Sequence, residues 1–192
     1  PPFNQTLAIR KNRMSYTIDE HKHRYAAWAA SRAASTKTCR FEVQIGKEII
    51  EETGLNALLS SPEKLPSSDR IDAEHKIWRE KAIKAAESKG LVGFGHGIAA
   101  KLINVYLKGA FVCAGHESHP NVAALHTPID SLLLDELYFN NVGGLKSDWS
   151  LARKLRWSKF DSPQYEAVIQ SIRKALPNTP LWQVESYWRG YQ

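Results

Sequence analysis

Apolar residues recur at helical spacing along most of the chain, and no segment keeps the two-residue alternation of a half-buried strand. Capping residues mark the ends of the expected helices: Thr17 precedes the first of them, and Gly54 and Gly90 each follow another. We therefore predict a single all-α domain over residues 17–192, preceded by a flexible basic arm over residues 1–16. The expected helices cover residues 17–35, 41–53, 55–60, 70–89, 98–108, 128–139, 147–157, 163–176 and 180–189.

A run with glycine at every second position, from Gly93 to Gly97, comes directly before the helix expected over residues 98–108. Glycine lets the backbone take positive φ and approach a ligand closely, and the free amide groups at the start of a helix suit an anion such as phosphate. Lys101 and Lys108 fall on one face of this helix. The pattern therefore favours contact with nucleic acid, and its candidate residues are Gly93, Gly95, His96, Gly97 and Lys108.

Composition and charge agree with this interpretation and add limits to it. Lysine and arginine outnumber aspartate and glutamate by 26 to 20, and the formal charge of +6 suits a polyanionic partner. The two cysteines, Cys39 and Cys113, favour a reducing setting, which is either the cytoplasm, in association with the nucleoid, or another intracellular location. They also exclude an all-cysteine [4Fe–4S] cluster, which needs four thiolates. No apolar run approaches the roughly 20 residues that span a bilayer, so no membrane partner is expected.

Two short segments resemble a known family. Residues 97–107 contain Gly97-Ile98-Ala99-Ala100-Lys101 followed by Asn104, and residues 127–133 contain Ile129-Asp130. Together they resemble the core of the helix-hairpin-helix DNA glycosylases, in which a Gly-hydrophobic-Gly-x-Lys hairpin opens one helix and a hydrophobic-Asp pair opens the next. Ala99 stands where that family usually has its second glycine. The 29-residue step from Lys101 to Asp130 (130 − 101) is more similar to the archaeal 8-oxoguanine branch than to the endonuclease III branch.

The resemblance implies an all-α, glycosylase-like domain whose helix-hairpin-helix covers about residues 70–108. It also implies a monomeric base-excision repair glycosylase with AP-lyase activity. Its substrate would be double-stranded DNA with a damaged base, and an oxidised purine such as 8-oxoguanine is the expected lesion. Lys101 would be the nucleophile that forms a Schiff base, and Asp130 the carboxylate that stabilises positive charge on the sugar. No metal and no cofactor are expected.

A second register and two other functions stay open. If Gly93-Phe94-Gly95 is the hairpin, Gly97 falls at the lysine position and the nucleophile is missing. The protein would then be a monofunctional glycosylase that uses Asp130 and water, or a non-catalytic helix-hairpin-helix protein that binds nucleic acid. The third possibility is a helical protein-binding domain in which the glycine run is only a turn.

Structural roles also explain some of the candidate residues. If Thr127 is an N-cap and Pro128 the first helical residue, Asp130 satisfies free amide groups of the helix and needs no catalytic role. Three tryptophans are candidates for a base pocket, although aromatic side chains more often serve in packing. They are Trp28, Trp182 and Trp188.

Residues 109–126 are expected to form a loop that is rich in histidine. Its candidate metal ligands are Cys113, His116, His119 and His126. These side chains could gather around zinc, but they lack the paired spacing that structural zinc sites usually show. A surface insertion, or a loop beside the substrate, is the preferred interpretation.

Overall fold

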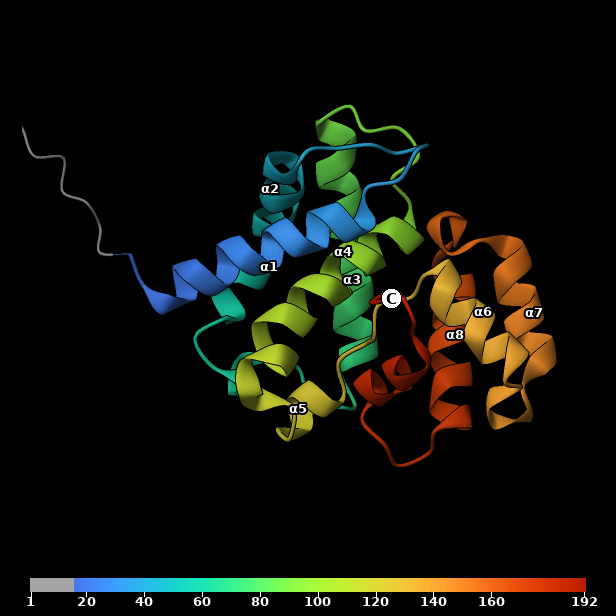
Figure 1. The fold of residues 1–192 in the computed structure, drawn as a ribbon. Helices are drawn as coiled ribbons and strands as arrows, with labels where there is room; N and C mark the ends of the chain where they lie inside the picture. Colours follow the sequence, from blue (N-terminus) through green and yellow to red (C-terminus); the bar gives the residue numbers. More distant parts are fainter. Residues whose placement is uncertain (1–15) are drawn as a thin grey trace, which may run out of the picture.

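The computed structural model describes residues 16–192, and every regular element in that range is helical (Figure 1). The predicted all-α class is confirmed for this range, whereas the basic arm predicted for residues 1–16 lies, except for Tyr16, outside the described residues. The α-helices are α1 (Ile18–Ala34), α2 (Val43–Thr53), α3 (Ile71–Ser88), α4 (His96–Leu107), α5 (Pro120–Ala123), α6 (Ser131–Phe139), α7 (Lys146–Leu155) and α8 (Ser162–Ala175). Short 3-10 helices cover Leu55–Leu58, Pro62–Lys64, Val142–Gly144, Trp157–Lys159 and Leu181–Tyr187, and a π-helix covers Lys108–His116.

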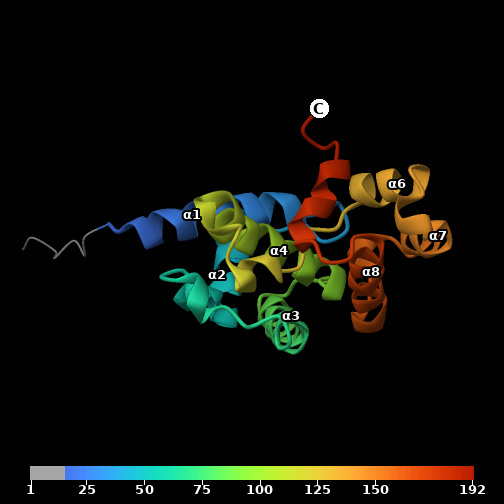
Figure 2. The same ribbon diagram turned by 90° about the horizontal axis from the view of Figure 1, so that it is seen from below.

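Two apolar clusters form the core, and α4 connects them. The first cluster contains buried residues between Ala26 and Leu125, and the second contains Ala100 together with buried residues between Ile129 and Val184. Figures 1 and 2 show the corresponding division, with α1 to α5 on one side of the molecule and α6 to α8 on the other. Trp157 packs against both clusters. Groups near this boundary are therefore held by both halves of the protein.

Local capping signals fixed several helix ends as predicted. The Thr17 hydroxyl accepts a hydrogen bond from the backbone N–H of Glu20 at 3.2 Å, which caps α1. Gly54 and Gly90 both take the left-handed conformation, with φ of 84° and 74°, after α2 and α3. Glycine adopts this conformation without the steric penalty of a Cβ atom, which is why it ends helices so often.

The structure differs from the first register, in which Gly97 to Lys101 form the hairpin. The turn between α3 and α4 covers residues 89–95, and α4 begins at His96 with Gly95 as its N-cap. Gly97 to Lys101 therefore lie inside α4 and do not form a hairpin. The position of the turn agrees with the alternative register, in which Gly93-Phe94-Gly95 is the hairpin and Gly97 takes the place of the lysine.

The loop predicted over residues 109–126 is wrong, because α4 leads directly into the π-helix and α5 follows. The combined helix His96–His116 is long and apolar enough to cross a membrane, although the sequence pattern did not predict such a segment. However, 67% of its apolar window is buried inside the protein. This burial is that of a central core helix.

Two further helix boundaries also differ from the prediction. Asp130, not Thr127, is the N-cap of α6, which begins at Ser131. The carboxylate of Asp130 accepts a hydrogen bond from the Leu133 N–H, as a capping side chain does. The last predicted helix is a 3-10 helix that ends at Tyr187.

Candidate functional site

Lys101 and Asp130, the predicted nucleophile and carboxylate, meet at the boundary between the two clusters. The Lys101 Nζ atom lies 2.9 Å from Asp130 Oδ2. Only 8% of the lysine side chain and 18% of the aspartate side chain are exposed. α4 supplies the lysine and the start of α6 supplies the aspartate, so the packing of the two clusters creates the pair.

Three donors from three segments hold the Asp130 carboxylate. Oδ1 accepts from the Leu133 N–H at 2.9 Å, and Oδ2 accepts from both Lys101 Nζ and the indole N–H of Trp188, the latter at 3.0 Å. Asp130 is therefore a helix cap and the partner of a buried lysine at the same time. The two interpretations of this residue are compatible.

The pair lies at a cavity of about 270 Å³. Its walls are mainly apolar or aromatic, and its polar groups include two lysines, two carboxylates, one thiol, the Tyr25 hydroxyl and the Trp188 indole N–H. The lining residues are Tyr25, Ala29, Ala33, Lys101, Val105, Lys108, Gly109, Cys113, Pro128, Asp130, Glu185 and Trp188. A small apolar cavity with a few convergent polar groups is typical of a site for a small molecule or a single ring system.

The second lysine of the cavity is also paired. Lys108 forms an ion pair with Glu185 and lies over the Trp188 ring, 5.6 Å from its centroid. The other oxygen of Glu185 accepts a hydrogen bond from the Thr127 hydroxyl at 3.0 Å. Lys108, a predicted DNA contact, is therefore neutralised by the C-terminal segment.

The predicted backbone contacts of the glycine run divide into two groups. Gly93 is exposed, with φ of 80°, and Gly95 is half-buried at the start of α4. Gly97 is buried, and its N–H donates to the Phe160 carbonyl at 3.2 Å. A Cβ atom at Gly97 would overlap with the Trp157 carbonyl oxygen. The close approach that Gly97 permits is therefore to the protein's own backbone.

His96 faces the interior. Its Nδ1 atom lies 3.2 Å from Arg79, a fully buried arginine that also bonds Ser162 and Glu166 on α8. Burial, followed by the nearby Arg79 charge, lowers the pKa of His96. The neutral imidazole is therefore bonded within the protein and gives little positive charge for a phosphate.

The three candidate tryptophans have different surroundings. Trp188 lines the cavity and bonds Asp130. Trp28 is 51% exposed on α1 and does not line this cavity. The buried indole nitrogen of Trp182 has no hydrogen-bond partner among the described residues. Only Trp188 is part of the wall.

Sequence reasoning missed Trp157. The Lys101 Nζ atom lies 5.8 Å from the centroid of the Trp157 ring. Trp157 contacts the lysine without lining the cavity. Trp157 follows Arg156, which takes a positive φ of 65°. No local sequence signal predicts this contact, because it depends on how the turn after α7 packs against α4.

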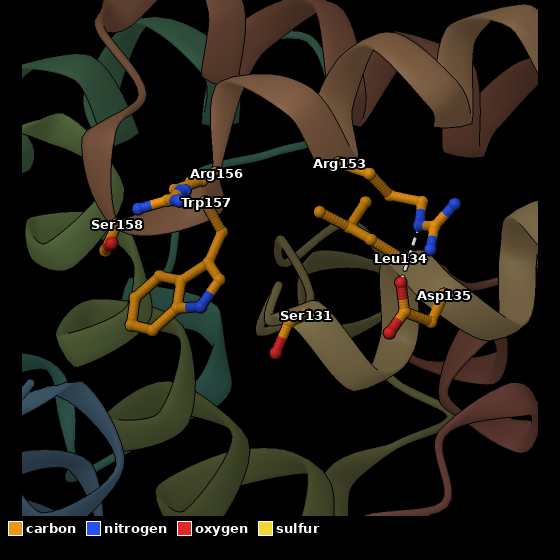
Figure 3. A pocket seen from close by; sticks show the side chains of 7 residues that line it. All are labelled: Ser131, Leu134, Asp135, Arg153, Arg156, Trp157 and Ser158. Carbon is orange, nitrogen blue, oxygen red and sulfur yellow. Dashed lines mark hydrogen bonds and ion pairs between the residues drawn. The ribbon is translucent and has the colours of Figure 1, made fainter.

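Trp157 also lines a second cavity, again of about 270 Å³ (Figure 3). In Figure 3, Trp157 and Arg156 form one side of it, and Arg153 and Asp135 form an ion pair on the opposite side. Ser131, the first residue of α6, lies between them. Asp130 precedes Ser131 in the sequence and lines the first cavity, so the start of α6 contributes to both cavities.

A buried polar network lies under α4. Asn104, the third residue of the predicted motif, donates to the Thr127 carbonyl and to the Tyr165 hydroxyl, and its side-chain oxygen lies 2.7 Å from His75 Nε2. Burial lowers the pKa of His75 well below its ordinary value, and burial also lowers the pKa of His126, which stacks on it at 4.2 Å. Asn104 therefore has a structural role.

His126, one of the four candidate zinc ligands, forms hydrogen bonds within the protein. Its ring bonds the Tyr165 hydroxyl at 2.9 Å and the Asp72 carboxylate at 2.8 Å. The hydrogen bond from His126, with that from Arg173, holds the pKa of Asp72 well below its usual range. Within residues 16–192, no group of three or more His, Cys, Asp or Glu residues is placed to hold a metal ion. The four candidate zinc ligands do not gather.

Comparisons with protein-family models, curated proteins and solved structures find no match for this chain. Its function must therefore be inferred from the residues and contacts of the site itself.

Proposed function

We propose that the protein is a DNA base-excision repair glycosylase with AP-lyase activity, with Lys101 as the nucleophile and Asp130 as the essential carboxylate. The observation that supports the proposal best is the ion pair of a nearly buried lysine with a carboxylate, at a cavity of suitable size for one ring system. An oxidised purine such as 8-oxoguanine is the proposed lesion.

The chemistry requires a neutral amine. The Asp130 carboxylate, 2.9 Å away, is placed to accept a proton from Lys101. The amine then attacks C1′ of the damaged nucleotide, the bond from C1′ to the base breaks with its electron pair leaving on the base, and the base takes up the proton that Asp130 had accepted. Asp130, a carboxylate again, stabilises the positive charge that develops on the sugar.

The lyase step follows from the same covalent adduct. When the bond from C1′ to the ring oxygen opens, the nitrogen loses a proton, the oxygen gains one, and a Schiff base remains on Lys101. Loss of a 2′ proton then expels the 3′ phosphate. The Schiff base is the species that borohydride reduces to a stable amine.

The target base must leave the helix to reach Lys101, as in other enzymes that act on a base. The cavity offers flat or apolar walls for it, from Tyr25, Pro128 and Trp188. In this proposal α3, the turn at residues 89–95 and α4 form the helix-hairpin-helix, and the nucleophile Lys101 lies one helical turn after Gly97, which holds the position of the family's lysine. The exposed Gly93 makes the phosphate contact, and the buried Gly97 does not.

A specific observation favours a second function, that of a non-catalytic helix-hairpin-helix protein that binds nucleic acid. Because the turn ends at Gly95, the position expected for the lysine holds Gly97, and Lys101 lies one helical turn later. In that case the pair between Lys101 and Asp130 is only a structural link between the two clusters.

Borohydride trapping separates the two functions. Wild type, Lys101→Gln and Lys108→Gln are incubated with duplexes that carry 8-oxoguanine, uracil or an abasic site. Borohydride is added, and the fraction of DNA linked covalently to protein is measured. Lys108→Gln is the matched control, because Lys108 lines the same cavity and also pairs with a carboxylate. We expect an adduct with wild type and Lys108→Gln that Lys101→Gln loses. If wild type binds the duplexes but traps none, the binding function replaces the enzymatic one.

A further inference from the structure

Two aromatic side chains on α1 are exposed next to the cavity. Tyr25 is 63% exposed and Trp28 is 51% exposed, and their ring centroids lie 6.0 Å apart with a tilt of 36°. Tyr25 also lines the cavity with Ala29 and Ala33, which follow at four-residue steps along the same face. Trp28 lies beside this face, so the two rings continue the cavity outward onto the surface of α1.

Three positively charged side chains follow the aromatic pair along α1 and the segment after it. Arg32 lies one turn after Trp28, and Lys37 and Arg40 follow in the segment that leads to α2; all three are exposed. They line a hollow of about 660 Å³ in which Glu42 is the one acidic lining residue. None of the three forms an ion pair with another residue of the described range 16–192. Their charge is therefore available to a partner.

The same surface reaches the turn before α4. A Cβ atom on Gly93 would lie 3.7 Å from the Thr38 carbonyl, and the rings of Phe41 and Phe94 pack with centroids 5.7 Å apart. In Figure 1 the chain from α1 to α2 lies beside the chain from α3 to α4. Tyr25, Trp28, Arg32, Lys37, Arg40 and Gly93 therefore form a strip, which we call the α1 strip.

We infer that the α1 strip binds a single, unpaired strand of DNA. Aromatic faces next to unpaired cations are the combination that single-stranded nucleic acid requires, because bases stack on the rings while phosphates contact the cations. A perfect duplex hides its base faces, so it cannot use Trp28. That the strand continues to a base in the Lys101 cavity rests on the proposed function, whereas the strand binding itself does not.

The substrate class follows from this arrangement. A damaged base within a bubble, a mismatch or a single strand leaves neighbouring bases free to stack on Trp28, and extrusion of the target is also easiest there. The strip therefore predicts that unpaired DNA is preferred over a fully paired duplex with the same sequence.

The first test measures binding of labelled single-stranded oligonucleotides and of the matching duplexes by fluorescence polarisation. Trp28→Ala should weaken single-strand binding by about 5- to 150-fold, as expected for the loss of one stacked base, and should change duplex binding by less than about twofold. Trp28→Phe should retain most of the affinity. Phe139→Ala is the matched control, since Phe139 is an exposed aromatic residue outside the strip. Equal affinity of Trp28→Ala and wild type for single strands would overturn the inference, as would equal losses on single strands and duplexes.

Salt dependence tests the positive part of the strip. Arg40→Gln should reduce the slope of log affinity against log salt for single strands by about 0.7, the contribution of one phosphate contact. An unchanged slope for Arg32→Gln, Lys37→Gln and Arg40→Gln would contradict the strip as a path for the backbone.

Trapping and single-strand binding together distinguish a failure of the proposed function from a failure of the α1 strip. If no lesion traps with wild type, while Trp28→Ala still weakens single-strand binding, the enzymatic proposal fails and the strip remains. If wild type traps an abasic site but Trp28→Ala traps it equally well in single strands and duplexes and binds both like wild type, the strip fails and the enzyme remains.

Discussion

The two lysines on the cavity side of α4 and its extension have the same type of partner and different surroundings. Lys101 pairs with Asp130, and 8% of its side chain is exposed. Lys108 pairs with Glu185, and 33% of its side chain is exposed. Asp130 is also held by the backbone at the start of α6, whereas Glu185 belongs to a short 3-10 helix near the C-terminus. The comparison teaches that the burial of the lysine side chain, not the residue types of the pair, distinguishes Lys101 from Lys108.

Gly97 lies one helical turn before Lys101, and Gly109 directly follows Lys108. The two glycines differ in how much room a Cβ atom would have. At Gly97, there is no room for a Cβ atom beside the Trp157 carbonyl. At Gly109, a Cβ atom would lie 3.5 Å from the Cβ of Ala26, which is an ordinary contact. The first part of α4 is thus packed closely against the second cluster, and the region after it is packed less closely against α1.

The largest effect is expected from the carboxylates. Asp130→Asn keeps a good helix cap but removes the charge, so the rate of adduct formation should fall on the order of 10²- to 10³-fold. Glu185→Gln should reduce the rate by less than about tenfold, because it affects only the pair with Lys108. Single-turnover borohydride trapping on an abasic duplex measures both rates. Equal losses in the two variants would remove the distinction between the pairs.

The glycines should differ in stability. Gly97→Ala forces the Trp157 turn away from α4 and should lower the free energy of unfolding by about 3 kcal/mol or more. Gly109→Ala should change it by about 1 kcal/mol or less, because the new methyl group has room. Denaturant unfolding of both variants measures the difference. A Gly97→Ala protein as stable as wild type would show that the contact with Trp157 is loose.

Acid should lower the stability of the folded protein through its buried histidines. The pKa values of His75 and His126 are lowered by burial, so the unfolded chain binds protons near its ordinary pKa of about 6.5 that the folded protein does not. Stability is therefore full above this pKa and falls as the pH drops below it. We therefore expect a lower Tm at pH 5.5 than at pH 7.5.

A variant isolates the contribution of His75. His75→Gln removes one of the three rings whose pKa burial lowers, so its Tm should depend less on pH than that of wild type, even if its stability at pH 7.5 is lower. Thermal unfolding at both pH values gives this comparison. An equally steep dependence would assign the acid sensitivity to other groups.

The smallest effect is expected from the tryptophans. Trp188→Phe keeps a ring beside Lys108 but removes the hydrogen bond to Asp130 Oδ2, which is worth about 1 kcal/mol. The rate of trapping should fall about three- to tenfold. Trp157→Phe removes no hydrogen bond to Asp130, so its effect should be smaller. The same single-turnover assay compares them, and a larger loss for Trp157→Phe would show that the ring under Lys101 matters more than the bond to Asp130.

The sequence predicted what local interactions decide. Thr17, Gly54 and Gly90 end helices through contacts within a few residues, so their roles could be read from the chain. The start of α6 could not, because Thr127 and Asp130 are both good caps in sequence; in the structure Thr127 bonds the distant residues Asn104 and Glu185, and Asp130 caps the helix. The resemblance named Lys101 and Asp130 as site residues, but nothing in the sequence shows that they share one pocket; the packing of α4 against the start of α6 brings them to 2.9 Å.

Contacts between distant segments account for the remaining differences. Nothing near Trp157 in the sequence indicates that its turn packs against Gly97, and nothing near Trp188 indicates a bond to Asp130. The helical continuation after Lys108 was missed because its glycines and polar residues are typical of a loop, whereas Ala110 and Phe111 are buried in the first cluster. Tertiary packing overrides local preference in such segments.

The division of the site between the two clusters has a consequence for the newly made chain. Lys101 belongs to a helix of the first cluster, and Asp130 and Trp188 follow it in sequence and approach it from the second. During synthesis, the lysine therefore leaves the ribosome before its carboxylate, and the indole that holds the carboxylate comes last. A nascent chain or a fragment that ends before residue 130 has the amine without its partner, so the ion pair can form only after the second cluster has been made.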